Sequence, residues 1–473
     1  MICFNDFKDA ERVFYYFEEI SKIPHGSGNT AHIADYLVSF AENHGLSFYR
    51  DESNNVLIRK PATNGLESRP TVIIQGHTDM VAEKLPDLDK DMQTEGLEIY
   101  RDGDFLRARG TTLGGDDGVA VAYALALLES KDIPHPAIEA LFTSDEETGL
   151  IGATALDPSV LDGRIMINID SDDEGIFTVG CAGGARTDIS FAVNRESFEG
   201  KRYSLKVGGL LGGHSGVEIH KMRGNASKLL ATILSELGDI RIAAILGGNM
   251  DNAITREAEA EFVTNSSVTE AFTRAAERIS TELERTDPNF YAELTECESE
   301  LIPLDSESTA RLLSIMGSIH SGVVATSGDI EGLVESSQNI GIVRLDEKFR
   351  ITTSVRSAKG ESKKAMIANL REIAQKNGAE VSVRGEYPAW EYRPESHLRD
   401  VCCKVYSDMY GKNAEVIVIH AGLECGIFSD KIEGLDCISI GPDNFDIHTT
   451  EEHLSISSTA RVWEFLKNIL KEI

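Results

Sequence analysis

The sequence predicts an α/β fold in which a mostly parallel central sheet is flanked by helices and an α+β domain is inserted. Three short apolar runs, Thr71–Gln75, Ile138–Thr143 and Arg164–Ile169, have the length and composition of strands buried on both faces. The segment Asp116–Ser130 is apolar nearly all round, which is typical of a buried helix. Between residues 188 and 388 the expected strands become shorter and more alternating. Apolar strands that alternate with helices indicate a parallel sheet covered on both faces.

The other elements of the α/β domain follow from apolar periodicity and from the usual start and stop signals of helices. Helices are expected at Asp9–Ile20, from Asn29 or Thr30 to Gly45, at Ser396–Met409 and from Ser457 onward. Strands are expected at Ser47–Arg50, Val56–Arg59, Glu415–Ile419 and Leu435–Ile440, the first two joined by the polar turn DESNN. Because the α/β pattern returns near the C-terminus, residues 1–187 and 389–473 are expected to form one domain.

The inserted domain, residues 188–388, contains two stretches of similar plan. The first has strands at Tyr203–Val207 and Arg241–Leu246 around a helix at Asn225–Leu237. The second has strands at Phe349–Val355 and Glu380–Arg384 around a helix at Ser362–Lys376. This repetition predicts a two-part α+β domain of the kind that an old duplication produces.

Composition narrows the class of protein. The chain of 473 residues has 46 Lys and Arg against 78 Asp and Glu, for a net charge of −32. Such a charge repels nucleic acids and anionic membranes, so neither is an expected partner. The seven cysteines form no CxxC pair, the N-terminus does not resemble a signal peptide, and no apolar run approaches the roughly 20 residues that span a bilayer. We therefore expect a cytoplasmic protein.

Chemically capable side chains follow the predicted buried strands. They are His77 and Asp79 in GHTDM, Glu146 and Glu147 in SDEETG, Asp170 in DSDDEG, and His448 in the loop GPDNFDIHTTEEH. Asp116 and Asp117 stand at the mouth of the buried helix. Strand ends are where loops converge on a rigid sheet and where ligands usually bind.

Each of these motifs alone has an ordinary structural explanation, since Asp116 could simply cap its helix and the glutamates could form a solvated turn. Together they place several carboxylates beyond apolar strands, where unpaired charges would each cost several kcal/mol. A pair of divalent cations would remove that cost, and imidazole with carboxylate ligands suits zinc, manganese or cobalt. Spacing alone does not choose between His448 and His453.

The order of the motifs resembles the two-metal peptidase superfamily of aminoacylases, carboxypeptidases and dipeptidases, and most of all its aminoacyl-histidine dipeptidase branch. The motifs are GHTDMVAEK, GTTLGGDDGVAVA, SDEETGLIGA, INIDSDDEG, VGCAGGAR, GGHSG, HAGLECGIF and HTTEEHLSI. The resemblance covers essentially the whole chain. One departure is Asp117, where relatives often carry asparagine.

The resemblance implies a role for each site residue. Asp116 would bridge two ions, with His77 and Asp170 completing one site and Glu147 and His448 the other. Asp79 would orient His77, and Glu146 would be the general base. On the inserted lid domain, His214 would stabilise the oxyanion, while Asn252 and Arg356 would hold the polar ends of the substrate. Gly422 and Glu424 would lie near the substrate, and whether Glu424 contacts its amine or is structural stays open.

The expected activity is hydrolysis of dipeptides, broad or of the Xaa-His type, by a homodimeric enzyme. Two divalent ions are expected, with zinc as the first candidate and cobalt or manganese as alternatives. The inserted domain would serve as lid and dimerisation surface. Two rival readings are an N-acyl amino acid deacylase or carboxypeptidase, and a catalytically silent metal-binding protein. By family association Asp170 argues against the first, and the presence of Glu146 and Asp79 argues against the second.

Overall fold

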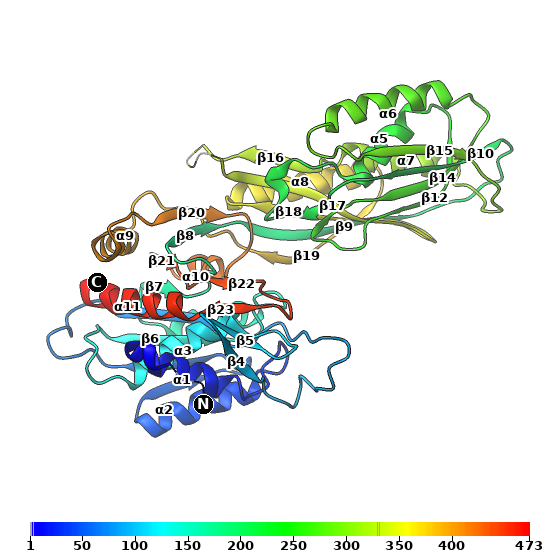
Figure 1. Ribbon diagram of the computed structural model, residues 1–473. Helices are drawn as coiled ribbons and strands as arrows, with labels where there is room; N and C mark the ends of the chain where they lie inside the picture. The colour runs from blue at the N-terminus through cyan, green and yellow to red at the C-terminus, as the bar shows by residue number, and fades with distance from the viewer. Residues whose placement is uncertain (1, 3, 329, 331) are drawn as a thin grey trace. The chain divides into compact units, whose positions relative to one another are not determined.

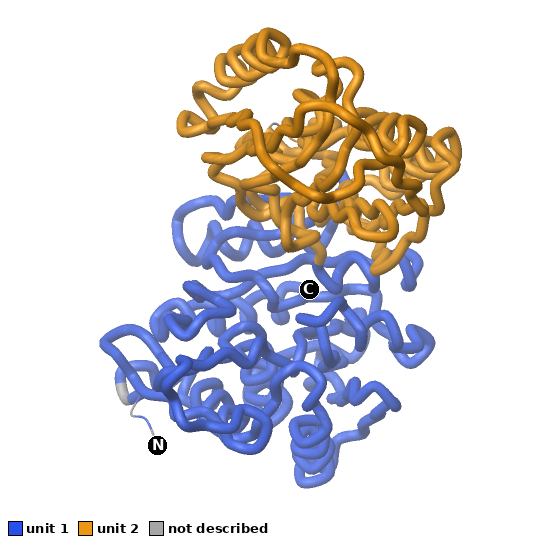
Figure 2. Tube along the Cα trace, turned by 90° about the vertical axis from the view of Figure 1, so that its right-hand side faces the viewer, with its two compact units in different colours: residues 1–180, 392–418, 423–473 blue, residues 181–391, 419–422 orange. Residues whose placement is uncertain are grey.

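The computed structural model describes Ile2, residues 4–328, Ile330 and residues 332–473, and Figure 1 labels its helices and strands where there is room. The chain divides into two compact units, coloured separately in Figure 2. Unit 1 consists of Met1–Gly180, Tyr392–Val418 and Leu423–Ile473, and unit 2 consists of Cys181–Glu391 and Ile419–Gly422. The sequence predicts domain boundaries after residues 187 and 388, whereas contacts divide the chain after 180 and 391 and assign the short segment 419–422 to unit 2.

An eight-stranded sheet forms the centre of unit 1, in the order β1–β2–β6–β3–β7–β21–β8–β20. Its strands are β1 Ser47–Arg50, β2 Val56–Lys60, β6 Ile138–Thr143, β3 Val72–His77, β7 Ile165–Asn168, β21 Asp436–Ser439, β8 Ile176–Cys181 and β20 Glu415–Ile419. The four central strands, β6, β3, β7 and β21, run parallel, whereas β2 joins β6 and β8 joins β21 antiparallel. The predicted mostly parallel sheet is confirmed, with antiparallel additions at its sides.

Apolar sequence explains why these strands lie at the centre. Every residue of β3 and β6 is buried, and α3 (Gly115–Glu129) is buried on nearly every side, as expected for a helix without a polar stripe. The other helices of unit 1 are η1 Asn5–Ala10, α1 Glu11–Ile20, α2 Ala31–His44, α4 Ile151–Ala155, η2 Pro158–Val160, α9 His397–Tyr410, α10 Glu424–Lys431 and α11 Ile456–Glu472. Most helix and strand boundaries predicted for unit 1 agree with these bounds within two residues.

A four-stranded sheet in unit 1 has no counterpart in the sequence predictions. Its order is β22–β23–β5–β4, from β22 Asn444–Phe445, β23 His453–Ser455, β5 Phe105–Ala108 and β4 Ile99–Asp102. Strands of two to four residues are too short for a reliable alternation pattern. The small sheet matters because it pairs β23 with β5, which brings the loop that carries His448 near the segment leading into α3.

Unit 2 is built on a nine-stranded sheet whose recorded pairings are all antiparallel. Its strands are β9 Gly183–Ala192, β10 Lys201–Gly208, β12 Arg241–Gly247, β14 Ala258–Thr264, β15 Tyr291–Glu296, β16 Gly322–Thr326, β17 Val334–Leu345, β18 Lys348–Ser357 and β19 Glu380–Tyr387. Its helices are η3 Ile219–Lys221, α5 Ala226–Glu236, α6 Thr269–Leu283, α7 Ser306–Ser318 and α8 Gly360–Lys376. The two predicted strand–helix–strand stretches correspond to β10–α5–β12 and β18–α8–β19.

Two very short strands, β11 (Gly213–His214) and β13 (Ala253–Ile254), form a separate antiparallel pair in unit 2. Among the residues that the structure describes, no helix is both long enough and apolar enough to cross a membrane.

Candidate metal centre and active site

Three adjacent parallel strands deliver most of the predicted ligands to one edge of the unit 1 sheet. His77 is the last residue of β3, Glu146 and Glu147 follow the end of β6, and Asp170 follows the end of β7. The carboxyl ends of neighbouring parallel strands necessarily meet. Asp116 joins them from the first turn of α3, so residues that lie far apart in the sequence converge.

The Asp116 carboxylate lies between the two predicted metal positions. Its Oδ1 is 2.9 Å from His77 Nε2, and its Oδ2 is 3.1 Å from His448 Nε2. On the first side, Asp170 Oδ1 is 3.6 Å from the same His77 nitrogen. On the second side, Glu147 Oε1 is 2.8 Å from His448 Nε2. Ligand atoms of His77, Asp116 and Asp170 lie within 4.8 Å of one another, and so do those of Asp116, Glu147 and His448.

The hydrogen bonding of His77 fits a metal ligand. Its Nδ1 lies 2.9 Å from the main-chain carbonyl oxygen of Asp79, and because a carbonyl only accepts, Nδ1 carries the proton. In the neutral ring Nε2 then presents a lone pair toward the carboxylates of Asp116 and Asp170. Lone pairs facing one another in a buried site need a positive charge between them, which a divalent cation would supply.

The pKa values of these groups show the same demand for positive charge. Burial alone would lower the pKa of His77, but the carboxylates of Asp116, Asp170 and Asp79 raise it well above the usual value. Contacts with Asp116 and Glu147 raise the pKa of His448 to about 10. Burial raises the pKa of Asp170 to about 6. The donor set, two imidazoles and three carboxylates, is the one that zinc, manganese and cobalt accept.

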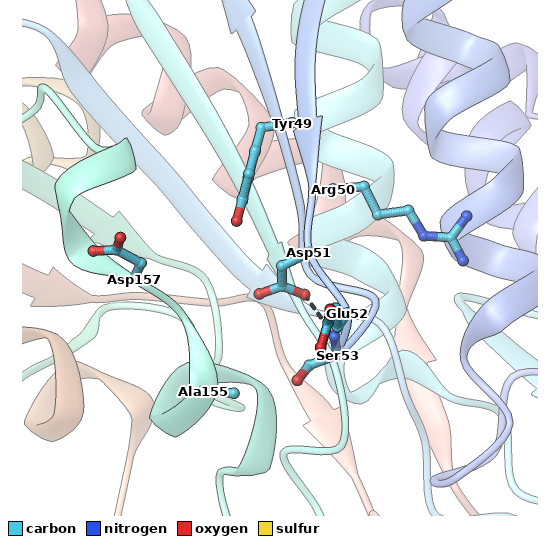
Figure 3. A pocket seen from close by; sticks show the side chains of 7 residues that line it. All are labelled: Tyr49, Arg50, Asp51, Glu52, Ser53, Ala155 and Asp157. Atoms are coloured by element: carbon cyan, nitrogen blue, oxygen red, sulfur yellow. Dashed lines mark hydrogen bonds between the residues drawn. The ribbon is translucent and has the colours of Figure 1, made fainter.

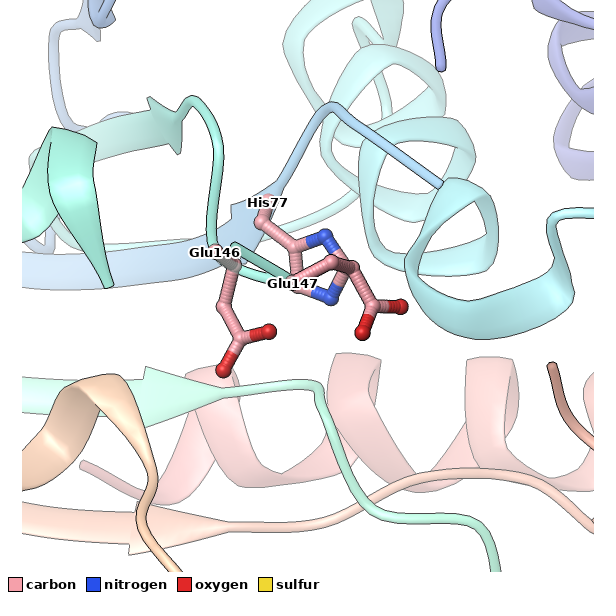
Figure 4. A group of neighbouring side chains, drawn as sticks. All are labelled: His77, Glu146 and Glu147. Carbon is pink, nitrogen blue, oxygen red and sulfur yellow. The ribbon is translucent and has the colours of Figure 1, made fainter. Parts of the chain in front are cut away.

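Glu146 and Glu147 stand side by side in the sequence but do not point the same way. Figure 4 shows their carboxylates turned apart on either side of the His77 ring. Glu147 faces His448. One carboxylate oxygen of Glu146 lies within 4.8 Å of ligand atoms of His77 and Glu147. Burial raises the pKa of Glu146 well above its usual value, and the negative charge of Asp170 adds to this effect.

Asp79 holds the loop that carries both glutamates. Its Oδ1 accepts the Glu146 main-chain N–H at 2.9 Å, and its Oδ2 accepts the Glu147 N–H at 3.4 Å and the Ser27 hydroxyl at 2.8 Å. The carboxylate Oδ1 lies 3.5 Å from His77 Nδ1, farther than the Asp79 carbonyl. Asp79 therefore contacts His77 mainly through its main chain and fixes the glutamate loop through its side chain.

Glu424, at the start of α10, is fully buried beneath the ligand-bearing strand ends. Its Oε2 accepts the Gln75 amide and the Thr143 hydroxyl, each at 2.6 Å, and Gln75 in turn accepts the Asn168 amide at 2.6 Å. This buried network joins the ends of β3, β6 and β7, and it favours a structural role for Glu424. Burial raises the pKa of Glu424 to about 7.

Four predicted substrate-binding residues belong to unit 2 and gather there. The β11–β13 pair sets His214 opposite Ala253, next to Asn252, whose carbonyl accepts the Ser215 N–H at 2.8 Å. A side chain at Gly216 would come within about 3 Å of both the His214 ring and the Arg356 guanidinium. Arg356 donates through its NH1 group to the Tyr387 hydroxyl at 3.0 Å, and the ring of Tyr387 packs against Gly422.

Hydrogen bonds fix the tautomer of His214. Its Nδ1 accepts main-chain N–H groups of Gly216 at 3.2 Å and Val217 at 3.1 Å. The proton of the neutral ring is therefore on Nε2, which is left as a donor. Burial and then the charge of Arg356 lower the pKa of His214, which keeps this neutral form. In Arg356, the buried Nε has no hydrogen-bond partner among the described residues.

Comparison with known proteins identifies the family. The family model described as peptidase family M20/M25/M40 matches residues 73–472. This chain belongs to that family. The cytosol non-specific dipeptidase of Escherichia coli K12 is 34% identical over 467 residues, which cover 97% of this chain and 96% of that protein.

Two solved structures superpose on this chain. The aminoacylhistidine dipeptidase of Vibrio alginolyticus superposes with a TM-score of 0.92 at 34% identity, covering 98% of this chain and 96% of the other. A tripeptidase from Staphylococcus aureus has a TM-score of 0.55 at 19% identity and covers 98% of each chain, so it supports the fold alone. The predicted fold and the superfamily resemblance are thereby confirmed.

Two residues that the sequence analysis does not single out contact the predicted site residues or the segment beside them. Ser27, in the loop PHGSGN, donates to Asp79, and Glu452, four residues after His448, is buried against the loop that precedes Asp116. Both lie in polar stretches whose composition resembles ordinary loops. The repeated glutamate in TTEEH was the only local signal for Glu452.

A separate hollow of about 660 Å³ on unit 1 contains none of the predicted site residues (Figure 3). It is lined by Tyr49, Arg50, Asp51, Glu52, Ser53, Ala155 and Asp157. Asp51 already accepts the main-chain N–H groups of Ser53 and Asn55, and Arg50 already contacts Asp35 and Asn54. The side chains of Asp51 and Arg50 are thus engaged by the fold itself.

Proposed function

We propose that this chain is a metal-dependent dipeptidase that hydrolyses the peptide bond of free dipeptides, broadly or with a preference for Xaa-His substrates such as carnosine-like ones. The observation that carries the proposal is the Asp116 carboxylate, whose two oxygens face His77 on one side and His448 on the other. The names of the Escherichia coli and Vibrio alginolyticus relatives, both dipeptidases, support the same activity.

We propose that the site holds two divalent ions, with zinc as the first candidate and cobalt or manganese as alternatives. His77, Asp116 and Asp170 would hold one ion, and Asp116, Glu147 and His448 the other. Bound ions would polarise the peptide carbonyl and make water a better nucleophile near neutral pH. The absence of cysteine from both groups argues against a structural thiolate site.

In this proposal Glu146 is the general base, which takes a proton from the attacking water and returns it to the leaving amine. Asp79 assists by holding the Glu146 main chain in place and by orienting His77 through its carbonyl. The Nε2–H group of His214 would donate a hydrogen bond to the developing oxyanion, a role for which its tautomer is already set.

The polar ends of the dipeptide are assigned to unit 2. Arg356 would bind the carboxylate, because a guanidinium with an unpartnered N–H matches a carboxylate in fork geometry. Asn252 and Gly422 would line the same subsite. The burial of Glu424 supports an indirect contribution, in which it braces the strand ends rather than touching the substrate amine.

We further propose a homodimer in which unit 2 (predicted domain 188–388) provides the lid and the contact surface. Several large apolar side chains of unit 2 are exposed, among them Val217, Met222 and Met250, and a second copy that covered them would remove them from water. The Escherichia coli relative is named as a cytosol enzyme, and we propose the same compartment for this chain.

A substrate panel tests the activity. The metal-loaded protein should hydrolyse dipeptides with a free amine, spare their N-acetylated forms, lose activity in a chelator and regain it with zinc, cobalt or manganese. Preference for the acetylated substrates would instead favour a deacylase. Metal binding without hydrolysis of either the free or the N-acetylated dipeptides would favour a catalytically silent metal-binding protein.

His214→Ala should lower kcat by ~10²–10³-fold, the usual effect of removing one oxyanion donor, while the bound metal is unchanged. His220 is an exposed histidine six residues away on the same stretch of chain, so His220→Ala is the matched control and should keep full activity. Steady-state kinetics and elemental analysis measure both effects. Equal kcat in the two variants would remove His214 from the mechanism.

A further inference from the structure

Glu452 makes an unusual set of contacts for a carboxylate. It is 3% exposed, and its oxygens are turned toward main-chain donors of the segment Leu113–Asp116. Oε2 accepts the N–H groups of Leu113 at 2.7 Å and Gly114 at 3.0 Å, and Oε1 accepts those of Gly115 at 2.8 Å and Asp116 at 3.4 Å. One side chain therefore engages four consecutive peptide groups more than 300 residues away in the sequence.

The segment is shaped to receive an anion. Gly114 has φ = +70°, a left-handed conformation that favours glycine. A side chain at Gly115 would come within 2.9 Å of the Asn444 amide. Consecutive main-chain N–H groups that converge in this way form an anion-binding concavity. The chain fills this concavity with its own carboxylate.

The concavity ends at the residue on which the metal centre depends. The last N–H that Glu452 engages belongs to Asp116, whose side chain faces both His77 and His448. Glu452 lies four residues after His448 on the same loop. Its carboxylate thus joins the main chain of the shared ligand to the loop of a second ligand. A water molecule in its place would accept at most two of the four donors.

We propose that Glu452 is a positioning residue for the metal centre, which presets Asp116 and the His448 loop for binding two ions. The proposal rests on the proposed function only in taking Asp116 and His448 as metal ligands. Residues that hold ligands in place typically contribute 10–100-fold to metal affinity or activity, so the effect is measurable in metal binding without any substrate.

The test compares Glu452→Gln and Glu452→Asp with Glu451→Gln, in the full-length protein stripped of metal. Glu451 is the exposed neighbour on the same loop, so its variant removes the same charge without touching the concavity. Co²⁺ is titrated by calorimetry and by visible absorption, which reports the geometry around cobalt. Thermal unfolding of each metal-free variant is measured alongside.

We expect Glu452→Gln to bind Co²⁺ about 10–100-fold more weakly than Glu451→Gln and to give an altered cobalt spectrum, with metal-free Tm values within a few degrees of each other. Glu452→Asp keeps the charge but is one methylene shorter and cannot reach all four donors, so it should weaken binding less. Unchanged Co²⁺ binding in Glu452→Gln would overturn the proposal. So would a fall in metal-free Tm large enough to account for the lost binding, because the role would then be structural.

If Glu452→Gln does not fold, the Co²⁺ titration of Glu452→Asp tests the proposal instead. Unchanged Co²⁺ affinity in Glu452→Asp would then overturn it. The outcome is separable from the activity itself. Wild-type protein that binds two Co²⁺ ions but cleaves no dipeptide contradicts the proposed function and leaves the Glu452 comparison valid. Wild-type protein that does not bind two ions contradicts the metal centre before any variant is compared.

Discussion

Replacing Glu146 by glutamine should lower kcat on a free dipeptide by ~10²–10⁴-fold, the usual contribution of a general base, and leave two ions bound. Glutamine has nearly the same shape but cannot accept a proton at neutral pH. The main-chain N–H of residue 146 would still donate to Asp79, so the loop should keep its position. Stopped or steady-state assays of hydrolysis and elemental analysis of the purified variant measure the two quantities.

Glu147→Gln is the contrast within the same loop. Glu147 contacts His448 and belongs to one of the two ligand groups, so its replacement should reduce the bound metal as well as the rate. An oxygen of Glu146 also lies within a compact group with His77 and Glu147. Loss of an ion in Glu146→Gln would show that Glu146 is a metal ligand. Full turnover by Glu146→Gln would exclude Glu146 as the general base.

Asp116→Asn should have the largest effect on metal binding. Asp116 is the carboxylate common to the His77–Asp116–Asp170 group and the Asp116–Glu147–His448 group, and asparagine offers a single oxygen and no charge. We expect the affinity for divalent ions to fall by more than about 100-fold, beyond the 10–100-fold typical of residues that only support a ligand. Dipeptide hydrolysis should become undetectable at stoichiometric metal.

Asp117→Asn is the matched control for Asp116. Asp117 belongs to neither ligand group. Its Oδ2 accepts the main-chain N–H of His77 at 3.1 Å, and the side-chain oxygen of asparagine can accept the same hydrogen bond. The control should retain two ions by elemental analysis and by calorimetry. Two ions bound with normal affinity in Asp116→Asn would contradict the arrangement on which the proposed function depends.

Much of the fold was accessible to sequence reasoning because burial imposes periodicity. Apolar runs predicted β3, β6 and β7, and the nearly uniform apolar composition of Asp116–Ser130 predicted the buried helix α3. The rule that parallel strands expose their carboxyl ends at one edge then brought His77, Glu147 and Asp170 into a single neighbourhood. The four-stranded sheet escaped prediction, since two to four residues carry too little pattern.

The choice between His448 and His453 shows what spacing cannot supply. His448 Nε2 lies 3.1 Å from Asp116, whereas the Nδ1 of His453 lies 2.9 Å from the Glu451 carbonyl and its ring stacks on Phe445. Along the sequence, only the family resemblance favours His448. In the structure the difference follows from β23, which turns His453 into the small sheet and leaves His448 on the connecting loop.

The sequence by itself determined the strands and helices and the identity of the candidate ligands, because these depend on local periodicity and on residue chemistry. Only the tertiary structure decided which carbonyl fixes the His77 tautomer, that the Asp79 side chain holds the glutamate loop, and that Glu452 fills the concavity before α3. These are hydrogen bonds whose partners are set by how loops converge. Donors and acceptors are common in every loop, so their pairing is fixed by position in space rather than by any pattern along the chain.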